Sequence, residues 1–297
     1  LGVLIPPTVI GVLLGGFTGI PVGSLFFGGF LPGLVIALGF CGWILLRCLA
    51  RPELAPPLPP EERPSFAEKL RASRQVAPAL ALVALVLGTI WFGVATPTEA
   101  AGIGAFGTLA IAFLSGAMGP RSLLEALRTS GEVSIMVVSL LIGGSLFTRL
   151  LQLSGAARML ADIMIGIEIG PVGMIVLFVL VVTLLGMFID GSAIIFIVSP
   201  IMMPVVQALD VDQVWFGVLM MMAIAAGYVT PPFGMNLFFL KGILIQASEM
   251  EGCGRLKSVG MGVIWRACLP YVLIMYGVIG LVLLFPGLAT WLPRMMH

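Results

Sequence analysis

The residues best suited to ligand chemistry form a polar string inside an apolar stretch. Gly227 to Asn236 reads G-Y-V-T-P-P-F-G-M-N. Its prolines interrupt a helix and free backbone carbonyls and amides, which membrane proteins tolerate only in buried protein or beside a polar cavity. Freed carbonyls with Thr and Asn oxygens suit a hard, weakly bound cation such as Na⁺, and the N-terminus of the next half-helix suits an anion. The alternative interpretation is a purely structural kink.

A second string supplies a carboxylate. Asp190-Gly191-Ser192 lies between the apolar segments 171–189 and 193–209. An acidic residue at membrane depth is a candidate functional group by default. The alternative is that Asp190 caps the second segment at a hydrated interface.

A third string contains another acid at an informative position. Thr96-Pro97-Thr98-Glu99 fits a capping box, with proline at the first helical position. The pattern therefore indicates the start of a helix. It leaves open a direct role for Glu99 in ion or proton coupling.

The composition places these strings in a membrane protein. Of 297 residues, 60% are hydrophobic and 10% are charged, whereas soluble domains carry about 25% charged residues. A net charge of +1 gives no basic field for nucleic acid. The single histidine, His297, leaves no basis for a His-ligated metal centre or Ser-His catalysis. The scattered cysteines indicate packing, so we predict no transition-metal site and no enzyme; they are Cys41, Cys48, Cys253 and Cys268.

Long apolar segments predict an all-α integral membrane protein, because about 20 apolar residues cross a bilayer. The segments are 3–22, 24–49, 77–95, 97–118, 133–153, 171–189, 193–209, 213–247 and 265–290. Segment 213–247 is too long for one simple span and contains a Pro-Pro break, which predicts a broken helix. Segment 171–209 is either two full spans or a re-entrant hairpin, and 265–290 is the terminal helix.

Residues 50–76 form a hydrophilic, proline-rich linker. Ser65 and Glu68 fit a capping box that opens a short amphipathic helix through Arg74, and a similar helix is expected over 120–132. Both are too short and too charged to span a bilayer. We interpret them as arms along the membrane interface, with solvated loop helices as the alternative.

The distribution of Lys and Arg predicts the orientation. These residues concentrate in 47–74 and 241–266, which places both segments on the cytoplasmic side. Counting spans from the linker then puts Asp210 and Asp212 outside.

Two motifs recur in the same order. Gly2-Val3-Leu4-Ile5-Pro6-Pro7 has the G-x-x-x-P-P spacing of Gly227–Pro232, and Phe30–Leu34 resembles Cys268–Val272. The helices that follow run in opposite directions under the predicted orientation, which is typical of the inverted repeats of secondary transporters. We therefore divide the chain into the end of a first repeat (1–49), the linker (50–76) and a second repeat (77–297). Only Leu1 precedes the first motif, so we expect the first repeat to lack its own hairpin.

Four strings carry a family resemblance that covers nearly the whole chain: LIPPTVIGVLLG, FGVATPTEAAGIGAFG, FIDGSAIIFIVSPIMMPVV and FGVLMMMAIAAGYVTPPFGMNLFFLKG. They resemble the large membrane subunit of tripartite ATP-independent periplasmic (TRAP) transporters. The resemblance implies an elevator-type carrier in the bacterial inner membrane, with Na⁺-coupled uptake of an organic anion. The implied substrate is a C4-dicarboxylate or a sugar-acid carboxylate such as sialic acid. The implied partners are a small four-helix membrane subunit, a periplasmic substrate-binding protein and the lipid bilayer.

The resemblance also implies a site. In that family, hairpins and broken helices form paired Na⁺ sites around the substrate, so the tip of 171–209 would face the unwound segment of 213–247. The candidate cation-binding residues are Asp190, Ser192, Gly227, Thr230, Pro231, Gly234, Asn236, Gly2, Ile5 and Pro6. The candidate substrate-facing residues are Thr98, Glu99, Ser192 and Asn236.

Other classes make different demands on the sequence. An aspartyl intramembrane protease needs two membrane Asp residues, but Asp190 is alone at depth. The remaining alternatives are a related anion:Na⁺ symporter that works without a binding protein, and a channel or non-transporting membrane protein. Broken helices and an inverted repeat favour alternating access over a continuous pore.

Overall fold

The computed structural model describes residues 1–56, 63, 65–116, 118–167, 169–248 and 259–296. The described chain is helical, as predicted, and contains no strand. Its α-helices are α1 (Val9–Thr18), α2 (Val22–Ala50), α3 (Phe66–Trp91), α4 (Pro97–Leu114), α5 (Pro120–Leu153), α6 (Ala156–Ile165), α7 (Gly170–Gly186), α8 (Gly191–Ala208), α9 (Gln213–Gly227), α10 (Met235–Ala247), α11 (Met261–Leu284) and α12 (Gly287–Thr290). Short 3₁₀ turns lie at Pro52–Leu54 and Pro293–Met295.

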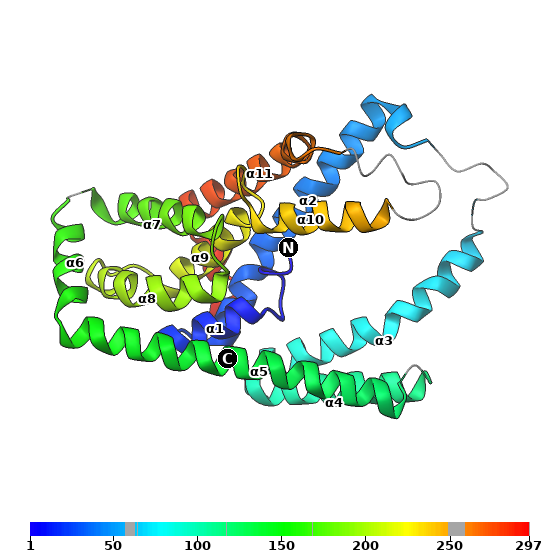
Figure 1. Cartoon of the computed structure of the whole chain (residues 1–297), viewed down its shortest axis with the longest axis horizontal. Helices are drawn as coiled ribbons and strands as arrows, with labels where there is room; N and C mark the ends of the chain where they lie inside the picture. The colour runs from blue at the N-terminus through cyan, green and yellow to red at the C-terminus, as the bar shows by residue number, and fades with distance from the viewer. Residues whose placement is uncertain (57–62, 64, 117, 168, 249–258, 297) are drawn as a thin grey trace. The chain divides into compact units, whose positions relative to one another are not determined.

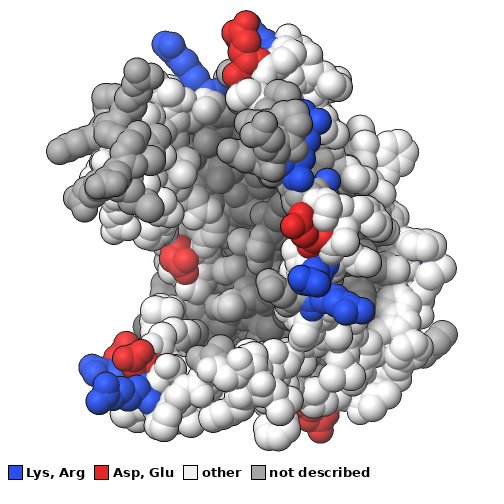
Figure 2. Space-filling model, turned by 90° about the vertical axis from the view of Figure 1, so that its right-hand side faces the viewer, with Lys and Arg blue, Asp and Glu red and all other residues white. Residues whose placement is uncertain are grey.

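Within the described residues, five helices are long and apolar enough to cross a membrane, namely α2, α4, α5, α8 and α11. The bent helix α3 is a sixth candidate. The apolar helices α1, α7, α9 and α10 are shorter. Figure 2 shows one face of the molecule, where the described charged side chains form small, separate groups on a largely uncharged surface. Such a surface suits contact with lipid rather than water.

Some expected boundaries differ from the structure. The expected arm at 120–132 and span at 133–153 form the single helix α5, because no proline interrupts it after its first residue. The arm ending at Arg74 and the next span likewise join in α3, which bends by 46° after Arg74. The terminal helix divides near Pro286, since the residue before a proline disfavours helical backbone.

Helix α6, part of the linker and the cysteines complete the comparison with the sequence-based expectations. The amphipathic helix α6 was not expected, because it is too short to register as a span. The proline run at 57–62 of the linker, and Cys253, lie outside the described residues. The other three cysteines are free thiols.

The chain divides into two compact units. The first comprises 1–40 and 138–294, and the second comprises 41–137 and 295–297. In the second unit α3 packs against α4, and capping boxes open both helices: Ser65 with Glu68, and Thr96 with Glu99. Gly107 of α4 permits this packing, because a Cβ there would lie 2.4 Å from Leu82 Cδ1.

Helix α9 forms the core of the first unit. It packs against α7, α8, α11 and α1, and Figure 1 shows it among these helices, next to the green ribbons of α7 and α8. Met220, Met221 and Met222 are at most 1% exposed, so this methionine run faces protein rather than lipid. Trp215 Nε1 donates a 2.8 Å hydrogen bond to the carbonyl of Val282 and thereby fixes α9 to α11.

Glycines set the distance between α7 and α9. A Cβ on Gly227 would lie 2.7 Å from the Thr183 carbonyl oxygen and 2.8 Å from Gly186 Cα. Real Cβ atoms do not approach backbone so closely. The two helices therefore touch backbone to backbone where α9 ends, and this contact holds the end of α9 against the end of α7.

We predict that Gly227→Ala lowers the free energy of unfolding by about 1–3 kcal/mol, because overpacking forces the two backbones apart. The matched control is Gly280→Ala in α11, where a Cβ would meet no atom within 4 Å. The measurement is the thermal melting midpoint in detergent, followed by size-exclusion chromatography. Equal midpoints for the two variants would contradict the close contact.

Candidate functional site

The turn between α7 and α8 presents a capped carboxylate. Asp190 is the N-cap of α8, and its Oδ1 accepts a 2.9 Å hydrogen bond from the Ser192 backbone amide. The Ser192 hydroxyl also donates to Oδ1. Ser192 is buried, whereas Asp190 remains exposed at the tip. The capping interpretation therefore holds for Asp190, and it leaves part of the carboxylate available to other groups.

The break expected within 213–247 falls between Gly227 and Met235. Thr230 Oγ1 donates to the Ala226 carbonyl over 2.6 Å and lies 3.2 Å from the Tyr276 hydroxyl. Gly234 precedes α10 with φ +53°, and a Cβ there would lie 3.0 Å from the Thr230 carbonyl oxygen. Only glycine fits this turn comfortably, because both the backbone conformation and the space exclude a side chain. The Pro-Pro bonds of both motifs, Pro6-Pro7 and Pro231-Pro232, are cis.

Tyr228 joins the tip to the break. Its hydroxyl accepts a 2.7 Å hydrogen bond from the Gly191 amide and donates a 3.1 Å hydrogen bond to Asp190 Oδ2. Its backbone carbonyl accepts a 3.0 Å hydrogen bond from the backbone amide of Asn236. One residue therefore links the N-terminus of α8, the end of α9 and the start of α10.

The N-terminal end of α1 lies beside the tip between α7 and α8. Thr8 caps it by accepting a 3.0 Å hydrogen bond from the Gly11 amide. A Cβ on Gly191 would lie 2.9 Å from Ile10 Cδ1, 2.6 Å from Ile224 Cγ2 and 2.6 Å from the Tyr228 hydroxyl oxygen. The positive ends of α1 and α8 thus meet beside the negative end of α9, so the site offers favourable potential to ligands of either sign.

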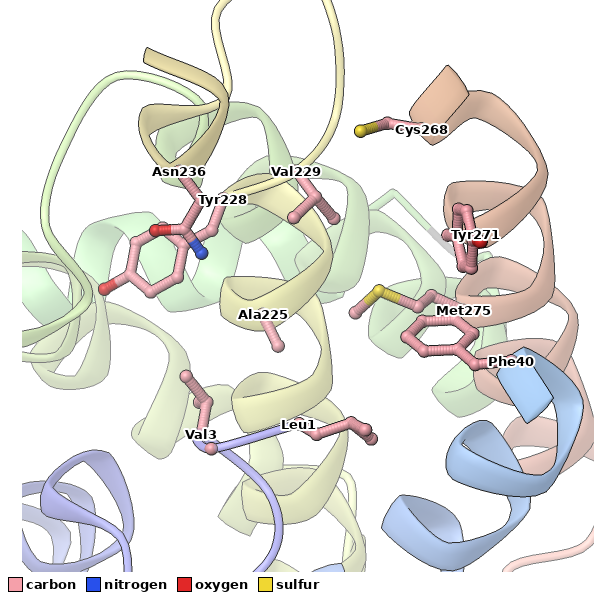
Figure 3. A pocket seen from close by; sticks show the side chains of 11 residues that line it. Leu1, Val3, Phe40, Ala225, Tyr228, Val229, Asn236, Cys268, Tyr271 and Met275 are labelled. Carbon is pink, nitrogen blue, oxygen red and sulfur yellow. The ribbon is translucent and has the colours of Figure 1, made fainter. Parts of the chain in front are cut away.

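A cavity of about 470 Å³ opens beside the break (Figure 3). The lining residues are Leu1, Gly2, Val3, Phe40, Ala225, Tyr228, Val229, Asn236, Cys268, Tyr271 and Met275. Both G-x-x-x-P-P motifs therefore contribute to one cavity. Phe40 and Tyr271 form its aromatic wall, with ring centroids 5.1 Å apart in an edge-to-face arrangement. No Lys or Arg is among the described residues of the lining.

The structure gathers most of the sequence-predicted residues in this region. Those of the tip and the break lie on segments joined by Tyr228; they are Asp190, Ser192, Gly227, Thr230, Pro231, Gly234 and Asn236. Gly2 lines the cavity. Ile5 instead packs against α2, 2.8 Å from where a Cβ of Gly33 would lie, and Pro6 is buried.

Thr98 and Glu99 lie in the second unit of the chain. The Glu99 carboxylate accepts 2.8 Å hydrogen bonds from both the amide and the hydroxyl of Thr96. These contacts are those of a capping box. A role for either residue toward substrate or ion stays a prediction.

Sequence reasoning missed two residues. Tyr228 stands inside the chosen string, and the presence of a phenol among apolar neighbours was the available signal. Thr183 on α7 is 3% exposed, and its hydroxyl has no hydrogen-bond partner among the residues that the structure describes. Nothing local marks Thr183, since its position beside Gly227 arises from tertiary packing.

The described geometry can be compared with known proteins. Residues 1–288 match the family model described as the tripartite ATP-independent periplasmic transporter, DctM component. The chain belongs to the DctM family. The TRAP resemblance predicted from the sequence is therefore confirmed. DctM proteins are transporter permeases rather than enzymes, and this chain is accordingly a multi-pass protein of the bacterial inner membrane.

Curated DctM-type relatives match along most of this chain. It is 28% identical to the C4-dicarboxylate TRAP transporter large permease protein DctM of Vibrio cholerae, over 100% of this chain and 66% of the relative. It is 30% identical to the isethionate TRAP transporter permease protein DctMQ of Oleidesulfovibrio alaskensis, over 82% of this chain and 38% of the relative. It is 25% identical to the sialic acid TRAP transporter permease protein SiaT of Haemophilus influenzae, over 100% and 45%. The chain thus spans about two thirds of the Vibrio cholerae relative's length.

We predict that Tyr228→Phe loosens the tip, because the buried Gly191 amide then loses its acceptor, at a cost of about 1–3 kcal/mol. Hydrogen exchange of peptides covering 189–196 should become faster. The matched control is Tyr271→Phe, which keeps the aromatic contact with Phe40. Unchanged exchange at the tip of the Tyr228→Phe variant would show that the link is dispensable.

Proposed function

We propose that this DctM chain serves secondary active uptake of an organic anion, coupled to Na⁺. The observation that carries the proposal is the junction at Tyr228, where a carboxylate-bearing tip meets a broken helix. Helix breaks in an apolar layer are retained where the freed polar groups serve a ligand. The junction combines oxygen atoms for a cation with helix N-termini for an anion.

The oxygens near the break fit Na⁺. Thr230 donates its proton to the Ala226 carbonyl and accepts a hydrogen bond from the Tyr276 hydroxyl, so one lone pair of Oγ1 remains for a cation. Asn236 adds an exposed amide oxygen, and Asp190 adds a carboxylate already oriented by Ser192. Carbonyls of the Thr230–Gly234 turn complete an oxygen-rich surrounding. Hard cations with low charge prefer such ligands.

The cavity beside the break suits the organic part of the substrate. Its aromatic and aliphatic wall accommodates carbon atoms, while the side chains of Asn236 and Tyr271 offer hydrogen bonds. Because no Lys or Arg belongs to the described lining, a carboxylate would depend on helix N-termini and bound Na⁺. The substrate class is a carboxylate of the C4-dicarboxylate or sugar-acid type, in line with the names of the relatives from Vibrio cholerae and Haemophilus influenzae.

The proposed architecture follows the inverted-repeat division into 1–49, 50–76 and 77–297. In it, α7 and α8 form a re-entrant hairpin, α9 and α10 form one broken helix, and the first turns of α3 and α5 are interfacial arms. The hairpin and broken helices would move together in an elevator mechanism, which the backbone contact at Gly227 favours. A small four-helix membrane subunit and a periplasmic substrate-binding protein complete the proposed tripartite system.

We predict that Na⁺ raises the thermal melting midpoint of the chain relative to K⁺, since a ligand that binds only the folded state stabilises it. Thr230→Ala and Asn236→Ala should each reduce this Na⁺-specific shift, because each removes an oxygen beside the break. The control is Thr108→Ala in α4, which removes a comparable bond to a helix carbonyl, here that of Gly104. An undiminished shift in both site variants would remove these residues from the cation site.

We further predict that Na⁺ and substrate strengthen each other's binding, because each lowers the electrostatic cost of the other and linkage is reciprocal. Succinate should bind the membrane complex about tenfold or more tightly in Na⁺ than in K⁺, within the usual range of such coupling. Titration calorimetry measures both affinities. Equal affinity in the two salts would refute coupling at this site.

A further inference from the structure

A second cavity borders α8. It has a volume of about 510 Å³ and is lined by the end of α1, the last turns of α5 and the C-terminal half of α8, all within the first unit. It shares no residue with the cavity beside the break. Its polar lining consists of Thr18, Ser145, Thr148, Arg149, Gln152, Ser199 and Gln207.

A buried hydroxyl in this lining has no partner. Ser199 is 2% exposed, and its Oγ makes no hydrogen bond with any residue that the structure describes. A serine within a helix ordinarily satisfies its hydroxyl on a carbonyl of the preceding turn. Thr18 and Thr148 do this, on the carbonyls of Leu14 and Gly144. The Ser199 hydroxyl therefore keeps unused hydrogen-bonding capacity in a residue that borders the cavity.

The same lining contains a permanent positive charge. Arg149 lies on α5, a candidate membrane span, and forms no ion pair with a carboxylate among the described residues. An arginine in such a segment is costly unless it serves a ligand or partner. Its planar fork matches a carboxylate through two parallel hydrogen bonds. Gln152 is nearly one turn further along the same helix and offers an amide to the same ligand.

We propose that this cavity is a second binding site for a carboxylate-bearing organic anion, held by Arg149, Gln152 and Ser199. Helix α8 connects it to the first site: Ser199 lies about 13.5 Å along the helix from Asp190 at the tip, at 1.5 Å per residue. The choice of a carboxylate rests on the proposed function. The two sites differ in electrostatics, because this one has its own cation and therefore needs no Na⁺.

The test follows protection of a cysteine in the cavity. Ser145→Cys is made in a chain whose four native cysteines are replaced by serine, and its reaction with a charged methanethiosulfonate is followed by intact mass spectrometry. We expect succinate to slow the reaction in K⁺ without Na⁺. Arg149→Gln should raise the succinate concentration for half-protection by about tenfold or more, as expected for loss of a charge-assisted contact. Ser199→Ala should raise it by a smaller factor.

The control variant is Arg158→Gln on α6, which removes an arginine of the same unit that does not line the cavity. It should leave protection unchanged. Three outcomes would each overturn the proposal. They are equal protection in Arg149→Gln, protection that requires Na⁺, and protection that appears only when lipid nanodiscs of phosphatidylcholine are replaced by nanodiscs of phosphatidylglycerol. Loss of Na⁺ coupling at the break with intact protection here would refute the proposed function alone.

Discussion

A helix that breaks inside an apolar layer must find new partners for the backbone groups it exposes, and here one phenol provides them. The Tyr228 hydroxyl accepts a hydrogen bond from the Gly191 amide and donates one to the Asp190 carboxylate. The backbone carbonyl of the same residue accepts a hydrogen bond from the backbone amide of Asn236. One residue thereby provides hydrogen-bond partners at three helix ends. Because leaving the buried Gly191 amide without its acceptor would cost about 1–3 kcal/mol, the break depends on this link.

The link is possible only because the backbones around it are close. Gly191 leaves no side chain between the start of α8 and the Tyr228 hydroxyl, and Gly186 leaves none between the ends of α7 and α9. The buried core of α9 then holds these approaches in place, anchored by the bond from Trp215 to Val282. The two glycines, the Trp215 anchor and the Tyr228 hydroxyl therefore depend on one another. Glycines permit close packing, close packing permits the hydrogen bonds, and the hydrogen bonds join the tip to the break.

The predictable features were those with local causes. Prolines and glycines marked the break before Gly234, Asp190 marked the start of α8, and the Ser65 and Thr96 capping boxes marked two further helix starts, because each signal acts within a few residues. The continuity of α5 was missed, since a charged first turn resembles a separate arm when only composition is considered. The partner of Tyr228 was also missed. The family resemblance implied that the tip would face the break, but not which side chain would join them, because the partner lies 37 residues away and only tertiary packing brings it into contact.

The placement of positive charge bears on the coupling mechanism. A fixed arginine beside the break would attract a carboxylate whether or not Na⁺ were bound, and binding of the two would no longer be linked. The described lining of the cavity beside the break contains no Lys or Arg, whereas Arg149 lines a separate cavity. In the proposed mechanism, attraction at Arg149 is constant, whereas attraction at the break rises with each bound cation. An anion would then bind the cavity at Arg149 in either salt, and would bind the cavity beside the break tightly only together with Na⁺.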